Sequence, residues 1–256
     1  LTHADTGAIA AAPTTSLPEA IGGVRNWDYR YTWIRDASLS SQALISMGHS
    51  EEALELLFWI ERVSEARFKD RFELQIMYGL HGESEIPETP LEHLEGYMGS
   101  RPVNIGNAAA KQFQLETFGE LLNTGYELVR RGEELGPHLE NFLCDIVEIV
   151  ADVWEKPDYG IWEMRGEPRH FTYSKVMAWV AFDRAIYLAE RYGLPGNVEK
   201  WRTIREAIRR QVLEHGYDRK TGSFVISYGA RDLDAANIRI PLLEFLPFDD
   251  PRVQGT

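Results

Sequence analysis

Residues 171–215 read FTYSKVMAWVAFDRAIYLAERY, then GLPG, then NVEKWRTIREAIRRQVLEH, and from this stretch an architecture can be predicted. Residues 171–192 are apolar on nearly all sides, which predicts a helix covered on both faces. Residues 197–215 carry apolar side chains on one face and arginines on the other, which predicts an outer helix with one solvated face. The tight GLPG connection makes the two an antiparallel hairpin of an inner and an outer helix.

The same alternation runs along the whole chain. Helices are predicted at residues 34–47, 50–66, 106–131, 137–155, 171–192 and 197–215, with a seventh beginning near Asp234, and short strands at residues 74–78 and 223–228. Short connections (48–49, 132–136 and 193–196) alternate with long ones (67–105, 156–170 and 216–233). Stacked hairpins place the long loops together on one face, where a site can form.

Two all-α architectures fit this hairpin pattern. One is a closed toroid of inner and outer helices, and the other is an open α-solenoid, in which repeated hairpins stack in a row. The hairpins of this chain share no consensus sequence, which favours the toroid.

Composition limits the classes of partner. The chain has 256 residues and a formal net charge of -13, which disfavours nucleic acid and anionic membranes as partners and favours a small neutral or cationic one. Cys144 is the single cysteine, so no internal disulfide can form, and this favours a cytoplasmic location. The histidines lack zinc-site spacing, and no phosphate-binding loop or serine nucleophile motif is present, so we predict neither metal nor cofactor.

The loop at residues 158–165, DYGIWEMR, contains a candidate catalytic acid. The candidate, Glu163, has tyrosine, isoleucine, tryptophan and methionine as near neighbours in sequence. Apolar surroundings disfavour the charged form of a carboxyl group and raise its pKa, as a proton donor near neutral pH requires. The alternative is an exposed loop glutamate that forms a weak surface ion pair with Arg165.

Three clusters are expected to meet on the long-loop face: residues 33–36 (WIRD), 99–102 (GSRP) and 162–165 (WEMR). Tryptophan faces stack on sugar rings, and arginine and aspartate bond hydroxyl groups, so a neutral polyhydroxylated ligand fits. Alternatives remain for single residues. Asp36 could cap the first helix, Arg101 could bond local carbonyls, and Trp33 could be a core residue.

Several motifs together resemble glycoside hydrolase family 15, which holds glucoamylases, glucodextranases and bacterial and archaeal trehalases. The motifs, in the family's order, are RNWDYRYTWIRDA at 25–37, GSRPVNIGNA at 99–108, GIWE at 160–163, PRHF at 168–171, SYG at 227–229 and FLP at 245–247. The resemblance covers the chain from about Gly7 to its last residue. It implies a six-hairpin (α/α)6 toroid and an exo-acting hydrolase that releases glucose from α-glucosides with inversion.

The resemblance also implies roles for single residues. Glu163 is expected to be the general acid, Trp33, Arg35 and Asp36 to hold the terminal glucose, and Trp162 to form a neighbouring wall. Arg101 and Arg165 are further substrate-binding candidates. Met164 stands where fungal glucoamylases carry a second glutamate, which looks like the bacterial and archaeal branch and leaves starch-type glucans, isomaltose linkages and trehalose all open as substrates.

Residues 1–21 are interpreted as a lead-in, and residues 22–256 as roughly the first half of the barrel, incomplete at both ends. In the family the general base is a glutamate on a later loop, so this chain alone is expected to be inactive. We also expect that another copy of the chain covers the apolar surface that a half barrel leaves open, or that the isolated fragment is poorly soluble. The alternative function is a non-catalytic carbohydrate-binding or regulatory module.

Overall fold

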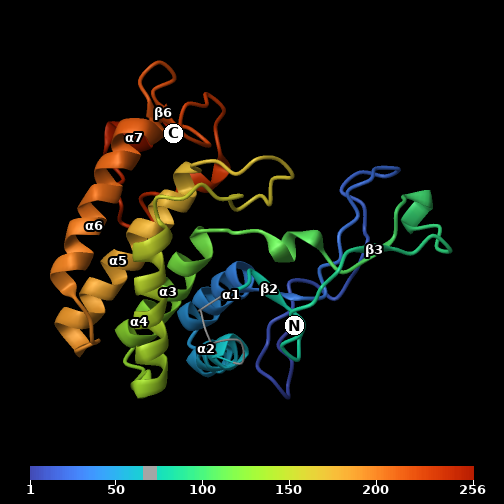
Figure 1. The fold of residues 1–256 in the computed structure, drawn as a ribbon, viewed down its shortest axis with the longest axis horizontal. Helices are drawn as coiled ribbons and strands as arrows, with labels where there is room; N and C mark the ends of the chain where they lie inside the picture. The colour runs from blue at the N-terminus through green and yellow to red at the C-terminus, as the bar shows by residue number, and fades with distance from the viewer. Residues whose placement is uncertain (66–73) are drawn as a thin grey trace. The chain divides into compact units, whose positions relative to one another are not determined.

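The computed structural model describes residues 1–65 and 74–256 (Figure 1). The chain divides into two compact units, Leu1–Gln112 and Phe113–Thr256, which we call unit 1 and unit 2. Between residues 34 and 216 the helices are α1 (Ile34–Ser46), α2 (Ser50–Glu65), η1 (Tyr97–Gly99), η2 (Ala108–Lys111), α3 (Glu116–Arg130), α4 (Gly136–Val153), α5 (Thr172–Tyr192), α6 (Val198–Gln211) and η3 (Val212–Gly216). Two short ones follow, η4 (Ala235–Arg239) and α7 (Pro251–Gln254).

The strands are two residues each and pair antiparallel. They are β1 (Thr32–Trp33) with β2 (Met77–Tyr78), β3 (Thr89–Pro90) with β4 (Asn104–Ile105), and β5 (Tyr217–Asp218) with β6 (Ser223–Phe224). The regular secondary structure of the described residues is therefore mainly helical. The last residue of the helix predicted at 50–66 lies outside the described residues.

Two predicted helices are wrong in extent. The helix predicted from residue 106 begins only at Glu116, because residues 108–111 form a separate 3₁₀ turn capped by the Asn107 side chain. The seventh helix predicted near Asp234 is a short 3₁₀ segment, η4, and the next helix, α7, begins at Pro251.

In unit 2, α5 is the inner helix. It packs against α3, α4 and α6, and its long apolar run, from Val176 to Leu188, is largely buried. Gly119 of α3 permits close approach, since a Cβ there would lie 2.2 Å from the Met177 carbonyl oxygen of α5. The predicted inner helix is confirmed.

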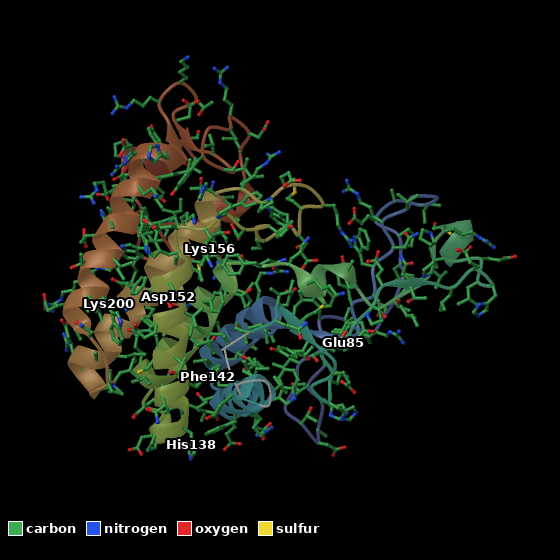
Figure 2. All side chains as sticks on the ribbon, viewed as in Figure 1. Glu85, His138, Phe142, Asp152, Lys156 and Lys200 are labelled. Atoms are coloured by element: carbon green, nitrogen blue, oxygen red, sulfur yellow. The ribbon has the colours of Figure 1, made fainter. Side chains whose placement is uncertain are left out.

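The α6 helix is the predicted outer helix, because only Trp201 and Ile208 are buried along it. Its first turn is tied to α4 at one carboxylate. Glu148 accepts hydrogen bonds from Lys200 Nζ at 2.5 Å and from Trp201 Nε1 at 2.8 Å. Figure 2 labels Lys200 on α6, with His138, Phe142 and Asp152 along α4.

The long connections of unit 2 lie together. Residues 154–171 and 216–234 meet where Phe171 pairs with Ser227 and where the Tyr228 N–H donates to the His170 carbonyl. The tight turns after α3 and α5 lie at the opposite end of the helices (Figure 1). The predicted alternation therefore holds in this unit.

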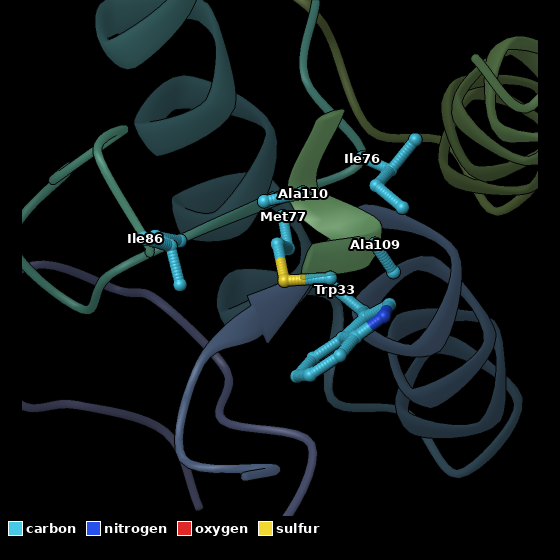
Figure 3. Packing of buried hydrophobic residues seen from close by; sticks show 6 residues of the cluster. All are labelled: Trp33, Ile76, Met77, Ile86, Ala109 and Ala110. Atoms are coloured by element: carbon cyan, nitrogen blue, oxygen red, sulfur yellow. The ribbon is translucent and has the colours of Figure 1, made fainter. Parts of the chain in front are cut away.

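Unit 1 pairs α1 with α2 and builds a small core around β1 and β2. The core cluster, drawn in Figure 3, consists of Trp33, Ile76, Met77, Ile86, Ala109 and Ala110. The lead-in runs beside the first motif, since the Ala11 and Ala12 N–H groups donate to the carbonyls of Tyr31 and Tyr29. Within residues 1–65 and 74–256, no helix has the length and apolar character needed to cross a membrane.

Candidate active site

The first two motifs are joined inside unit 1. The Asn26 side chain donates to the Pro102 carbonyl at 3.0 Å, and Asn104 Nδ2 donates to the Asn26 carbonyl at 3.4 Å. The Gly106 N–H donates to Asp28 Oδ2 at 3.2 Å. Residues 25–37 and 99–108 therefore form one connected structure, although they are far apart in sequence.

Asp28 is the central acceptor of this structure. It is fully buried and takes two side-chain hydrogen bonds from Arg30, each at 2.9 Å. Burial by itself raises the pKa of Asp28, but the bonds from Arg30 and Gly106 outweigh it and hold the pKa below its ordinary value. The carboxylate is therefore ionised and occupied, which suits a structural role.

The WIRD cluster begins at the junction of β1 and α1. Trp33 precedes the first turn of α1, so Asp36 lies within that turn and is not its N-cap. The Trp33 side chain is only 2% exposed, which favours the alternative that it is a core residue. Arg35 pairs with Asp36, Nη2 to Oδ2 at 3.1 Å, and the Asp36 side chain remains 44% exposed. An exposed carboxylate oriented by an arginine can accept hydrogen bonds from sugar hydroxyls.

Arg101 lies after η1 in the second motif. Its side chain is exposed and lines a surface hollow with Leu91 and Leu94. It can therefore reach a ligand at the surface of unit 1.

The loop that carries Glu163 is closed at its base in unit 2. Asp158 and Arg169 exchange two backbone hydrogen bonds, at 2.9 and 2.8 Å. Gly160 has a positive φ of 68°, and a Cβ there would lie 2.8 Å from the Phe171 ring. Only glycine fits this turn, and the turn sets the direction of the residues that follow.

Glu163 itself has an unusual backbone conformation. Its φ is 54°, in the left-handed region that costs a non-glycine residue about 1–3 kcal/mol and that clusters at functional sites. Its N–H donates to the Gly160 carbonyl at 3.2 Å. The turn that begins at Gly160 therefore holds Glu163 in its strained backbone conformation.

The apolar enclosure predicted for Glu163 is incomplete within unit 2. The Glu163 side chain is half-buried, whereas Trp162 is 55% exposed and Met164 is 40% exposed. Arg165 is exposed as well. The loop therefore exposes the Trp162 indole and the Arg165 side chain, and leaves the Glu163 carboxyl group half-buried.

Beneath this loop lies a buried polar anchor that the sequence did not reveal. Asp158 Oδ2 accepts hydrogen bonds from the Ser174 hydroxyl at 2.7 Å and from the N–H groups of Leu115 and Gly160, each at 3.1 Å. One carboxylate oxygen thus joins the loop to α5 and to the residue before α3. The anchor orients the loop on the helices.

Lys175 completes the anchor. It is fully buried and donates to the carbonyls of Trp154 and Lys156, at the start of the same connection. Burial lowers the pKa of Lys175 to about 8, against the opposing charge of Asp158, and burial raises the pKa of Asp158. A lysine in the first turn of the predicted inner helix was the one sequence signal for this cluster.

Trp162 contacts a second long loop. Its indole Nε1–H donates to Asp234 Oδ1 at 2.8 Å, and Asp234 also caps η4. The arrangement of Trp33, Arg35 and Asp36 opposite Glu163 involves both units, so it stays a prediction. Within the described residues, no group of three or more histidine, cysteine, aspartate or glutamate side chains is placed to hold a metal ion.

The family model described as glycosyl hydrolases family 15 matches residues 1–256 of the chain. The chain belongs to glycosyl hydrolase family 15. It is 46% identical over 256 residues to the trehalase of Mycobacterium tuberculosis, covering 100% of this chain and 38% of that protein. It is 40% identical to the trehalase of Thermoplasma volcanium, covering 100% of this chain and 40% of that protein. The chain thus spans about two fifths of these relatives.

Solved structures share the fold. A glycosidase variant in complex with glucose matches with a TM-score of 0.75 at 19% identity, over 100% of this chain and 64% of that one. A glucoamylase from Saccharomycopsis fibuligera matches with a TM-score of 0.65 at 13% identity, over 93% of this chain and 51% of that one. Together with the helical hairpins of unit 2, these matches confirm the predicted (α/α)6 fold class.

Proposed function

We propose that the protein containing this family 15 chain hydrolyses an α-glucoside and releases glucose, and that trehalose is its substrate. The observation that carries the proposal is the 46% identity to a trehalase across all 256 residues. The candidate acid and the WIRD cluster lie inside that span. A non-catalytic module has no need of the acid, so its presence supports an enzyme.

Glu163 is the proposed general acid. In its protonated form it donates a proton to the glycosidic oxygen as the bond from that oxygen to the anomeric carbon breaks. A second carboxylate takes a proton from water, whose oxygen attacks the opposite face of the sugar and inverts its configuration. We place this base in a part of the protein outside residues 1–256. The strained backbone of Glu163 supports a functional role for this position.

Asp36 and Arg35 are proposed to bond the hydroxyl groups of the bound glucose, with Trp162 as a stacking wall. Trp33 then shapes this part of the site from the core beneath it. Arg101 and Arg165 are proposed to contact the second sugar. The partner is therefore a small neutral saccharide, while a cytoplasmic location and pairing with a second copy remain predictions.

Glucose release from a panel of disaccharides tests the proposal. The full-length protein is expected to release glucose from trehalose faster than from maltose or isomaltose, and to leave the β-linked cellobiose intact. Preference for maltose or isomaltose would keep an α-glucosidase but reject trehalose as its substrate. No release from any α-glucoside would reject the enzyme and favour the non-catalytic module.

A further inference from the structure

The Trp162 ring is exposed, but one edge of it is held by a hydrogen bond. Its side chain is 55% exposed, yet its indole N–H is held at 2.8 Å by Asp234 Oδ1. Asp234 is only 7% exposed, so the acceptor lies inside the protein while the ring lies at its surface. An exposed tryptophan without such a bond samples several rotamers, and fixing one of them lowers the entropy cost of binding.

Asp234 is itself held rigidly. The same Oδ1 atom accepts the Ala236 N–H at 2.9 Å, which caps η4. The η4 segment forms hydrogen bonds with other parts of unit 2. Asn237 Nδ2 donates to the Val225 carbonyl at 3.2 Å, and Arg239 bonds Glu120 of α3 and Tyr173 of α5.

These contacts form a continuous path from the helices to the indole ring. It runs from α3 and α5 through Arg239 and η4 to Asp234, and from there to Trp162. Because Glu163 follows Trp162 directly, a sugar stacked on this ring has a defined position relative to the candidate acid. A hydrogen bond to a carboxylate is charge-assisted, which makes it stronger than one to a neutral acceptor.

We propose that Asp234 is a positioning residue that fixes the Trp162 indole as a stacking platform for a sugar of the substrate. The inference rests on the proposed function, since it assigns a sugar to the surface beside Glu163. Asp234 does not touch the substrate and acts only through the indole. The platform binds ground state and transition state alike, so its loss changes KM more than kcat.

Kinetics of the full-length protein on trehalose test the role. Asp234→Ala removes the acceptor, and Trp162→Phe keeps an aromatic ring but removes the N–H. Each is expected to raise KM about tenfold, the size of one hydrogen bond to a charged group, with kcat changed by less than about twofold. Asp234→Asn retains an acceptor oxygen and is expected to keep KM within about threefold of the wild-type value.

The double variant separates positioning from capping. If Asp234 acts through the indole, the double variant has the same KM as Trp162→Phe alone. The effects of the two substitutions on KM are then not additive. Asp232→Ala is the matched control, because this exposed aspartate lies on the same loop, and its KM is expected to equal that of the wild type. Unfolding temperatures are measured in parallel. Because Trp162→Phe leaves the cap of η4 intact, it tests the inference even if Asp234→Ala folds poorly.

Two results overturn the inference alone. In the first, the wild-type protein is active and Trp162→Phe has the same KM as the wild type. In the second, adding Asp234→Ala to Trp162→Phe raises KM by a further factor as large as that of Asp234→Ala alone. In the second case Asp234 acts through the cap of η4 and not through the ring. A wild-type protein that releases no glucose from any α-glucoside overturns the proposed function, and this inference falls with it.

Discussion

Replacing Glu163 by glutamine in the full-length protein is expected to lower kcat on trehalose by about 10²–10⁴-fold, the usual contribution of a general acid. Glutamine has nearly the same shape as the protonated carboxyl group but has no acidic proton to donate. The poor alcohol leaving group of trehalose then departs without protonation. Initial rates of glucose release give the effect.

The size of the loss is expected to depend on the leaving group. Fluoride leaves an α-glucosyl fluoride without needing protonation by the enzyme, so Glu163→Gln should lose far less activity on this substrate. Glu167→Gln is the matched control, since Glu167 is an exposed carboxylate on the same loop, and it should retain wild-type rates on both substrates. Near wild-type hydrolysis of trehalose by Glu163→Gln would assign the acid to another residue.

Replacing Asp158 by alanine is expected to lower the free energy of unfolding by about 3 kcal/mol or more, because buried donors lose the charged acceptor of their hydrogen bonds. Alanine leaves the Ser174 hydroxyl and the Leu115 and Gly160 N–H groups without their acceptor. It also leaves the buried Lys175 ammonium without its nearby carboxylate. Urea unfolding followed by tryptophan fluorescence measures the loss.

Two further variants make the Asp158 result specific. Asp158→Asn keeps an acceptor oxygen for the three donors, so it should be less destabilising than alanine. Asp152→Ala changes an exposed aspartate on α4, labelled in Figure 2, and should change the unfolding free energy by less than about 0.5 kcal/mol. An Asp158→Ala protein as stable as Asp152→Ala would show that the anchor does not hold the loop.

The helices were predictable where their apolar pattern is periodic. This holds for α1, α4, α5 and α6, whose predicted positions agree with the structure to within a few residues. Residues 106–115 were mispredicted as helix because their alanines favour one. In the structure the Gly106 N–H is bonded to Asp28 and Asn107 caps a short 3₁₀ turn, so tertiary contacts override local propensity.

The candidate site was predictable in its residue types but not in its supports. Motif resemblance identifies Glu163, Trp162 and Asp36 because their local sequences are distinctive. Asp158 and Asp234 act through partners far away in sequence, such as Leu115 and Trp162, and no local pattern encodes these pairings. A helix beginning near Asp234 was predicted, but the hydrogen bonds from the Ala236 N–H and the Trp162 indole to its Oδ1 atom emerged only in three dimensions.

The proposed reaction of the full-length protein is hydrolysis of trehalose with inversion, with Glu163 as the acid. Proton NMR of the anomeric protons, recorded in the first minutes before mutarotation, determines the stereochemical outcome. Inversion converts the attacked glucose to the β anomer while the departing glucose keeps its α configuration, so we expect equal amounts of the two anomers. Release of α-glucose alone would indicate retention and would rule out the inverting mechanism.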